Sequence, residues 1–217
     1  MQKKRTAILI SGRGSNMMAL VEAASHPAFP AEIVAVMANR ADAAGLAWAA
    51  ERGIATLPID HKAYASREAF ELALHQALLG FRVEIVCLAG FMSVLTASFV
   101  DQWQGRMINI HPSLLPAFKG LHTHERALAA GVRIAGCTVH FVVPEMDAGP
   151  IIVQAAVPVA EADTPEDLAD RILSAEHRIY PQALRLLADG RLRIDAGRVL
   201  GSPPIDSGAG LTSPPAK

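Results

Sequence analysis

The fold is indicated first by an apolar run, a glycine-rich turn and a helix start near the N-terminus, in the stretch Thr6-Ala7-Ile8-Leu9-Ile10-Ser11-Gly12-Arg13-Gly14-Ser15-Asn16. The run from Thr6 to Ile10 has the length of a strand, and a helical period follows from Ser15 to Ala24. A strand that turns directly into a helix is the first half of a β-α-β unit, whose second strand lies parallel to the first. This stretch therefore predicts an α/β fold.

The same alternation of short apolar runs and helical periods continues along the chain. Further strands are predicted at residues 32–37, 54–57, 83–89 and 106–110, and further helices at residues 41–52 and 66–79. Gly53 and Gly80 follow these two helices, in the position typical of a helix C-terminus. Residues 83–89 are apolar almost throughout, as expected for a central parallel strand that is covered on both faces.

The C-terminal part has a different pattern. Two later strands are predicted at residues 134–142 and 151–159, and the segment between them is too short for a helical crossover. These two strands should therefore pair antiparallel. The sequence as a whole predicts one doubly wound, mostly parallel sheet with helices on both faces and an antiparallel C-terminal portion.

The last predicted helix has a clear start. Thr164 is a good N-cap and Pro165 suits the first helical position. Apolar residues then recur at helical spacing and should face the sheet, namely Leu168, Ile172, Ala175 and Ile179. Pro181 should kink or interrupt this helix, because proline lacks the backbone N–H and its ring crowds the preceding turn.

Length and composition limit the classes of protein that remain. The chain has 217 residues, of which 51% are hydrophobic and 19% charged, which suits one compact globular domain. We expect that domain at residues 1–201, followed by a flexible tail rich in Pro, Gly and Ser at residues 202–217. The net charge is −1 and the basic residues are scattered, so we expect small-molecule substrates rather than a nucleic acid or a membrane. A homodimer is left open.

The cysteines and the hydropathy pattern indicate where the protein works. Cys87 and Cys137 each lie in an apolar run without a partner at metal-ligand spacing, as expected for buried residues in a reducing compartment. No run approaches the ~20 apolar residues that span a bilayer, and the first apolar run is too short for a signal peptide. We therefore expect a cytoplasmic protein.

The glycine-rich turn is the first candidate binding site. Gly12 and Gly14 let the backbone approach a ligand, and the free N–H groups of the helix start favour an anion. Ser15 and Asn16 could add side-chain donors. Met17 stands where a dinucleotide fingerprint has its third glycine, so a single phosphate group is the better interpretation. A tight turn without a ligand explains the pattern equally well.

The second candidate follows the strand predicted at residues 106–110. Asn109 and His111 are two residues apart and therefore project to the same side, at the end of the sheet where open α/β folds bind ligands. An amide donor beside an imidazole suits a reaction that passes through an oxyanion. The irregular segment at residues 111–124 favours function, although a structural hydrogen-bonded pair is the alternative.

Two other patterns leave their function open. Asp147 lies in a turn, and most aspartates in such turns are simply solvated. His122, His124 and His140 permit a metal-dependent hydrolase, although no Cys or Asp partner lies at ligand spacing, and we expect no metal.

Together, these segments resemble the folate-dependent phosphoribosylglycinamide formyltransferase family of purine synthesis, over about residues 5–195. The block Asn109-Ile110-His111-Pro112-Ser113-Leu114-Leu115-Pro116 is highly specific for enzymes that use formyl-folate. The other matching segments are Ile8 to Asn16, Leu88 to Met92, Gly120 to His124, Val139 to Val142, Asp147 to Pro150, and Glu176-His177. The resemblance implies a formyltransferase-type Rossmann-like fold and a cis bond before Pro116.

The resemblance also implies the reaction and its catalytic residues. The formyl group of 10-formyltetrahydrofolate, the co-substrate, would pass to the amine of glycinamide ribonucleotide. Asn109 would donate to the oxyanion that forms when the amine attacks the formyl carbonyl. His111 would be held as an imidazolium by Asp147, would stabilise the same oxyanion and would act as a general acid.

The binding residues are implied in the same way. Gly14, Ser15 and Asn16 would hold the ribotide phosphate, and Glu176 would contact its ribose or glycinamide part. The folate would be bound by Arg67, Met92, Ser93, Val94, Leu95, Asn109, Val143, Pro144, Glu145, Met146 and Asp147. Two positions depart from a bacterial branch of the family, since Ser93 replaces an arginine and Leu173 replaces a phosphate-binding glutamine.

Several other functions remain as alternatives. A methionyl-tRNA formyltransferase would add a C-terminal RNA-binding domain for which we expect no room, and a formyltetrahydrofolate deformylase would begin with a further domain. A module that binds a nucleotide or sugar phosphate without catalysis would need only residues 12–16.

Overall fold

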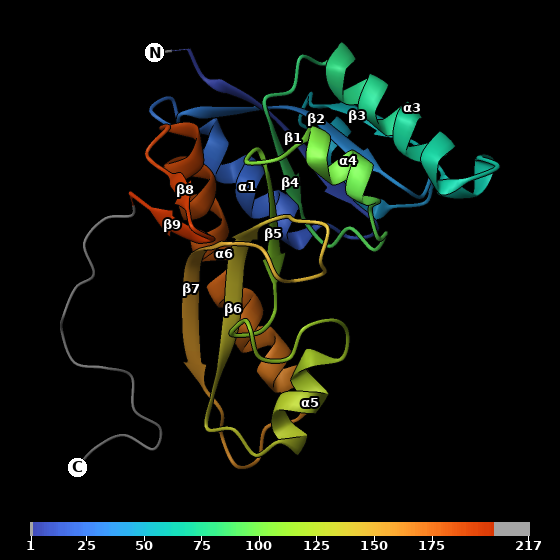
Figure 1. Ribbon diagram of the computed structural model, residues 1–217. Helices are drawn as coiled ribbons and strands as arrows, with labels where there is room; N and C mark the ends of the chain where they lie inside the picture. The colour runs from blue at the N-terminus through green and yellow to red at the C-terminus, as the bar shows by residue number, and fades with distance from the viewer. Residues whose placement is uncertain (1, 202–217) are drawn as a thin grey trace.

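A computed structural model describes residues 2–201, so the prediction of a flexible tail at residues 202–217 lies outside the described residues. A seven-stranded sheet with the order β3-β2-β1-β4-β5-β6-β7 forms the centre of the molecule (Figure 1). Its strands are β1 (Lys4–Ile10), β2 (Ala31–Ala38), β3 (Ala55–Pro58), β4 (Ile85–Leu88), β5 (Met107–His111), β6 (Ile134–Phe141) and β7 (Ile151–Pro158). The helices are α1 (Ser15–Ser25), α2 (Ala44–Ala50), α3 (Arg67–Gly80), α4 (Ala97–Gln102), α5 (Thr123–Ala129) and α6 (Pro165–Ala188), with a short 3-10 turn at His61–Ala63.

Strand direction confirms the predicted fold class. Strands β1 to β5 are mutually parallel where they pair, whereas β5–β6 and β6–β7 are antiparallel. The strand order runs outward from β1 to β3 in one direction and from β4 to β7 in the other. The carboxyl ends of β1 and β4 therefore flank the point where the order reverses, which is where ligands bind in doubly wound sheets.

Two hydrophobic cores form because the side chains of a strand alternate between its faces. Ile8 and Ile10 of β1 pack in one core with α1, α2, α5 and α6. Ala7 and Leu9 of the same strand pack in the other core with α3 and α4. Ala7 to Ile10 are therefore fully buried on both faces of the sheet, as in a central parallel strand.

The sequence predicted a kink or an interruption of α6 at Pro181, and the structure shows no interruption there. The start is confirmed, because the Thr164 side chain accepts from the N–H of Asp167 and the Asp167 side chain accepts from the N–H of Thr164, forming a capping box. The helix then runs without interruption through Pro181 to Ala188. One lost backbone hydrogen bond is tolerated because buried residues on both sides of the proline, among them Tyr180 and Leu184, pack against the sheet.

Helix α3 ends at Gly80, within one residue of the prediction, and the left-handed conformation after it falls on Arg82, with φ 52°. Two other local elements differ from the prediction. The short helix α4 was not predicted from the sequence, nor was the hairpin of β8 (Arg193–Asp195) and β9 (Arg198–Leu200). Elements of this length carry too few residues to show a period.

Two other expectations, for the cysteines and for Pro116, are confirmed. Cys87 and Cys137 are fully buried free thiols, and burial raises the pKa of Cys137 to about 12. The peptide bond between Leu115 and Pro116 is cis. Among residues 2–201, no helix has the length and apolar character needed to cross a membrane.

The two prolines of α6 should respond oppositely to the same substitution. Pro181→Ala should raise the free energy of unfolding by about 1–2 kcal/mol, because a helical hydrogen bond is restored at the expense of some entropy in the unfolded chain. Pro165→Ala should lower it slightly, since proline suits the first helical position. Urea titration of both variants measures the difference, and a destabilising Pro181→Ala would show that the ring itself packs productively.

Candidate active site

A buried serine joins the loops that follow three strands at the point where the strand order reverses. The hydroxyl of Ser11 donates to Asn39 Oδ1 at 2.6 Å and accepts from the N–H of Met92 at 2.7 Å. The backbone N–H of Ser11 also donates to the carbonyl of Gly90 at 3.2 Å. Ser11 therefore fixes the loops after β1, β2 and β4 against one another. No local pattern indicated this role, because the partners of Ser11 lie 28 and 81 residues away.

The glycine-rich turn has the conformation of an anion-binding helix start. Gly14 is the N-cap of α1 in the left-handed region, with φ 72°, and no side chain caps the helix. A side chain at Gly14 would also lie 2.9 Å from the Met17 side chain. The first turn of α1 carries no acidic residue, so its free N–H groups and positive dipole end are not neutralised locally.

Asn16 and Glu176 meet beside this turn, as the resemblance implied for residues of one site. Asn16 Nδ2 donates to Glu176 Oε2 at 2.7 Å, joining α1 to α6 across 160 residues. Glu176 is only 6% exposed, and burial raises its pKa to about 7, an effect that the Asn16 hydrogen bond partly offsets. A carboxyl that titrates near neutrality beside a candidate ligand site is typical of functional sites.

Asn109 and His140 face each other across the β5–β6 pair. They are directly opposite in the antiparallel register, and Asn109 Nδ2 lies 3.3 Å from His140 Nε2. His140 Nδ1 lies 2.8 Å from the carbonyl oxygen of Phe141, and burial lowers the pKa of His140. A neutral ring that donates through Nδ1 and accepts from Asn109 through Nε2 satisfies both contacts.

His111 and Asp147 form the contact on which the catalytic prediction depends. His111 Nδ1 lies 3.4 Å from Asp147 Oδ2, and both side chains are at least nine-tenths buried. The other ring nitrogen, Nε2, lies 3.1 Å from the carbonyl oxygen of Phe118. Both nitrogens therefore face oxygen acceptors, an arrangement that suits an imidazolium. The backbone N–H of Gly120 donates to the same carboxylate oxygen at 2.8 Å.

The irregular segment after β5 is held by buried polar contacts. Thr138 of β6 donates to the carbonyl of Ser113 at 2.7 Å and accepts from the N–H of Leu115 at 3.1 Å. Gln154 of β7 donates to Thr138 and to the carbonyl of Leu115. The segment is thus fixed to the antiparallel strands, which places Phe118 over His111.

Exposed apolar side chains occur at several of the positions that the resemblance assigned to the folate. Met92, Val94 and Met146 are 70%, 62% and 60% exposed, whereas Leu95 is buried in the core formed with α3 and α4. Ser93 is half-buried, and Val143, Pro144 and Glu145 belong to the turn between β6 and β7 that carries Asp147. Within the described part of the chain, Arg67 is an exposed first residue of α3 without a hydrogen bond or ion pair.

The structure brings together two groups of predicted residues. Asn109, His111 and Asp147 form one group, and the residues of the glycine-rich turn form the other with Glu176. His140 belongs to the first group although the sequence suggested it only as a metal ligand. Its position one residue before the end of β6, opposite Asn109, could have been found only by knowing the register.

The histidines weighed as metal ligands do not converge. His122 pairs with Glu125 on the surface, at 3.5 Å, while His140 contacts Asn109. Across residues 2–201, no three His, Cys, Asp or Glu side chains are grouped to hold a metal ion. The metal-dependent alternative therefore has no geometric support here.

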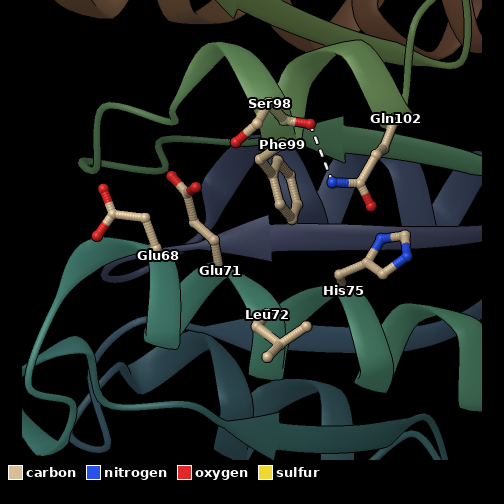
Figure 2. A pocket seen from close by; sticks show the side chains of 7 residues that line it. All are labelled: Glu68, Glu71, Leu72, His75, Ser98, Phe99 and Gln102. Carbon is tan, nitrogen blue, oxygen red and sulfur yellow. Dashed lines mark hydrogen bonds between the residues drawn. The ribbon is translucent and has the colours of Figure 1, made fainter.

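A cavity of about 160 Å³ lies between α3 and α4, and no candidate catalytic or ribotide-binding residue lines it (Figure 2). It is lined from α3 by Glu68, Glu71, Leu72 and His75, and from α4 by Ser98, Phe99 and Gln102. Glu71 accepts from the N–H of Thr96 at 2.7 Å and from its hydroxyl, so this carboxylate anchors the start of α4. We interpret the cavity as space left between the side chains where α3 and α4 meet.

Comparison with known proteins agrees with this geometry. Residues 4–184 match the sequence profile of the formyl transferase family. The chain belongs to the formyl transferase family. Formyl transferases of known structure share its fold: glycinamide ribonucleotide transformylase 1 from Symbiobacterium toebii has a TM-score of 0.88 at 49% identity, covering 91% of this chain and 93% of that one.

Curated relatives include proteins of similar length and much longer ones. The chain is 44% identical to phosphoribosylglycinamide formyltransferase of Escherichia coli (strain K12), covering 86% of this chain and 88% of that protein. It is 51% identical, over 91% of its own length, to the trifunctional purine biosynthetic protein adenosine-3 of Bos taurus. The chain spans 20% of the length of that trifunctional relative.

Gly149 should be required for the position of Asp147. A Cβ at Gly149 would lie 1.7 Å from the carbonyl oxygen of Phe141, so the turn must shift to accommodate any side chain. Gly149→Ala should lower the free energy of unfolding by about 1–3 kcal/mol and reduce catalytic turnover together with it. Denaturant titration and steady-state kinetics measure the two effects.

Gly80→Ala is the matched control for Gly149→Ala. No atom lies within 4 Å of a Cβ at Gly80, which is helical, so alanine should be neutral or slightly stabilising there. Equal stability of the two variants would show that the turn at residues 143–150 adapts freely and that Gly149 does not position Asp147.

Proposed function

We propose that this chain transfers the formyl group of 10-formyltetrahydrofolate to the amine of glycinamide ribonucleotide, as a phosphoribosylglycinamide formyltransferase. The observation that carries the proposal is the contact of His111 with Asp147 beside Asn109. Acyl transfer to an amine needs donors for a developing oxyanion and a group that delivers a proton to the leaving nitrogen. This cluster supplies both.

Asn109 is assigned to the oxyanion. One hydrogen of its Nδ2 is directed to His140 Nε2 at 3.3 Å, which leaves the second hydrogen for the formyl oxygen. Because His140 is buried and uncharged, it accepts from Asn109 without competing for the oxyanion. The amide is therefore oriented before a substrate binds, as electrostatic catalysis requires.

His111 is assigned to proton delivery. Asp147 compensates the charge of an imidazolium at His111 Nδ1, and the proton on Nε2 is then available for transfer. His111 Nε2 faces the carbonyl of Phe118 at 3.1 Å, so a substrate atom must replace or share that acceptor for the proton to be transferred.

The two substrates are assigned to opposite sides of this cluster. The free N–H groups of the glycine-rich turn, with the exposed guanidinium of Arg13, suit the phosphate of the ribotide. The exposed apolar side chains of Met92, Val94 and Met146 suit the flat rings of the folate, which supplies an activated formyl group when bound. Arg67 remains assigned to the folate through the resemblance alone.

Formation of tetrahydrofolate tests the function directly. The chain is mixed with 10-formyltetrahydrofolate, with and without glycinamide ribonucleotide, and in parallel with a chelator. We expect turnover that requires the ribotide and is insensitive to the chelator. Equal turnover without the ribotide would identify a deformylase, and inhibition by the chelator would restore the metal-dependent alternative.

Asp147→Asn should lower kcat by roughly 10²–10³ while leaving the fold intact. The amide oxygen can still accept from the N–H of Gly120, and asparagine tolerates the left-handed conformation of this residue, with φ 51°. What is lost is the negative charge beside His111. Asp195→Asn, an exposed change in the β8–β9 hairpin, is the matched control. A kcat near that of the parent in Asp147→Asn would refute the role of the pair.

A further inference from the structure

The segment at residues 118–122, which precedes α5, has a strained backbone. Phe118 and His122 have positive φ values of 54° and 56°, which residues other than glycine rarely adopt, and Gly120 between them has φ 81°. Such conformations cost free energy and persist only where the surrounding structure holds them in place. The strained segment therefore needs support from residues outside it.

The strained segment contacts both members of the catalytic pair, His111 and Asp147. The carbonyl oxygen of Phe118 lies 3.1 Å from His111 Nε2, and since a carbonyl can only accept, this contact requires a proton on Nε2. The backbone N–H of Gly120 donates to Asp147 Oδ2 at 2.8 Å, the oxygen that also lies 3.4 Å from His111 Nδ1. A change in this segment would therefore displace a partner of the imidazole and a partner of the carboxylate together.

Arg126 supports the strained segment from α5. Its Nη1 donates to the carbonyl of Lys119 at 2.6 Å and to the carbonyl of Leu121 at 3.3 Å. The guanidinium carbon lies 5.7 Å from the centre of the Phe118 ring, within the range of a cation–π contact. The flat guanidinium has donors in fixed directions, so one side chain can hold both carbonyls and the ring at the same time.

We propose that Arg126 is a positioning residue for the catalytic pair. It holds the strained segment so that the Phe118 carbonyl faces His111 Nε2 and the Gly120 N–H faces Asp147. Without Arg126 the segment can relax toward ordinary backbone angles, and the imidazole and the carboxylate each lose a fixed partner before a substrate binds. The consequence for catalysis rests on the proposed function, whereas the orientation of His111 and Asp147 does not.

The other contacts of the strained segment do not fix its backbone in the same way. Lys119 Nζ lies 3.2 Å from Glu145 Oε1, but this ion pair is exposed, and such pairs contribute little. The Phe118 ring packs at the edge of the core on the α5 and α6 side of the sheet. Both contacts are made by side chains of the segment, whereas Arg126 holds its carbonyl groups and so fixes the peptide planes.

Steady-state kinetics of Arg126→Ala separate positioning from substrate binding. We expect kcat to fall on the order of tenfold, a part of the roughly 10²–10⁴ that a positioned general acid contributes, with both KM values within about twofold of the parent. Arg52→Ala is the matched control, because Arg52 also donates to a carbonyl, that of Trp48, and lies over an aromatic ring, but at the end of α2. It should keep the parental kinetics. A raised KM with an unchanged kcat in Arg126→Ala would mean direct contact with a substrate and would overturn the proposal.

Two further variants test whether Arg126 acts through the catalytic pair. In an Asp147→Asn background, Arg126→Ala should lower kcat by less than about twofold, because the pair that it positions is already impaired. An equal loss in both backgrounds would refute action through the pair. Arg126→Lys keeps the charge but not the flat guanidinium, so it should restore kcat only in part, and full restoration would show that a positive charge alone suffices.

A measurement without substrates distinguishes this proposal from the proposed function. Exchange of the His111 Nε2 proton with water is followed by NMR, with its resonance assigned by its loss in His111→Asn. We expect exchange at least about tenfold faster in Arg126→Ala than in the parent or in Arg52→Ala, because the Phe118 carbonyl no longer holds this proton. An unchanged exchange rate would overturn the proposal. A parent protein that does not turn over the two substrates would instead refute the proposed function and leave this measurement valid.

Discussion

The antiparallel pairing of β5 with β6 is the constraint on which the candidate site depends. A parallel neighbour of β5 would be connected to it by a long crossover, and the position of its polar residues would depend on that connection rather than on the strand pairing. The antiparallel strand instead sets His140 directly opposite Asn109, and the turn that follows it returns at the same edge of the sheet. Asp147 lies in that turn, so the one change of direction brings it within 3.4 Å of His111. A shift of register by one residue would turn His140 to the other face and separate the group.

Burial also gives different roles to His111 and His140, the two histidines that lie near the carboxylate of Asp147. Asp147 Oδ2 lies 3.4 Å from His111 and Oδ1 lies 3.8 Å from His140, so both rings could compete for its charge. Desolvation lowers the pKa of His140, and its Nδ1 is already directed to the carbonyl of Phe141. His140 therefore serves Asn109 as an uncharged acceptor, and the negative charge of Asp147 is left to His111.

Local patterns predicted those parts of the protein that depend on neighbouring residues in sequence. The period of two on β5 placed Asn109 and His111 on one side, and the capping sequence at Thr164 gave the start of α6. Asp147 could not be assigned in this way, because the sequence around a turn aspartate is the same whether its side chain faces solvent or His111. The family resemblance implied its role, and in the structure Asp147 lies in contact with His111. Ser11 and His140 were missed because their partners lie on other strands or in the loops that follow them. At Pro181, tertiary packing outweighs the local preference to interrupt a helix.

Burial shifts the pKa of His140 and the pKa of Glu176 in opposite directions. Burial makes a cation less stable at His140 and an anion less stable at Glu176, so both groups tend toward their neutral forms near pH 7. An uncharged His140 lies 3.3 Å from Asn109 Nδ2 and orients that amide. The carboxyl of Glu176 accepts from Asn16 Nδ2 at 2.7 Å and orients a second amide beside the glycine-rich turn. A lone buried charge would cost far more than a hydrogen bond returns, so the one cation proposed for this site, on His111, lies against the carboxylate of Asp147.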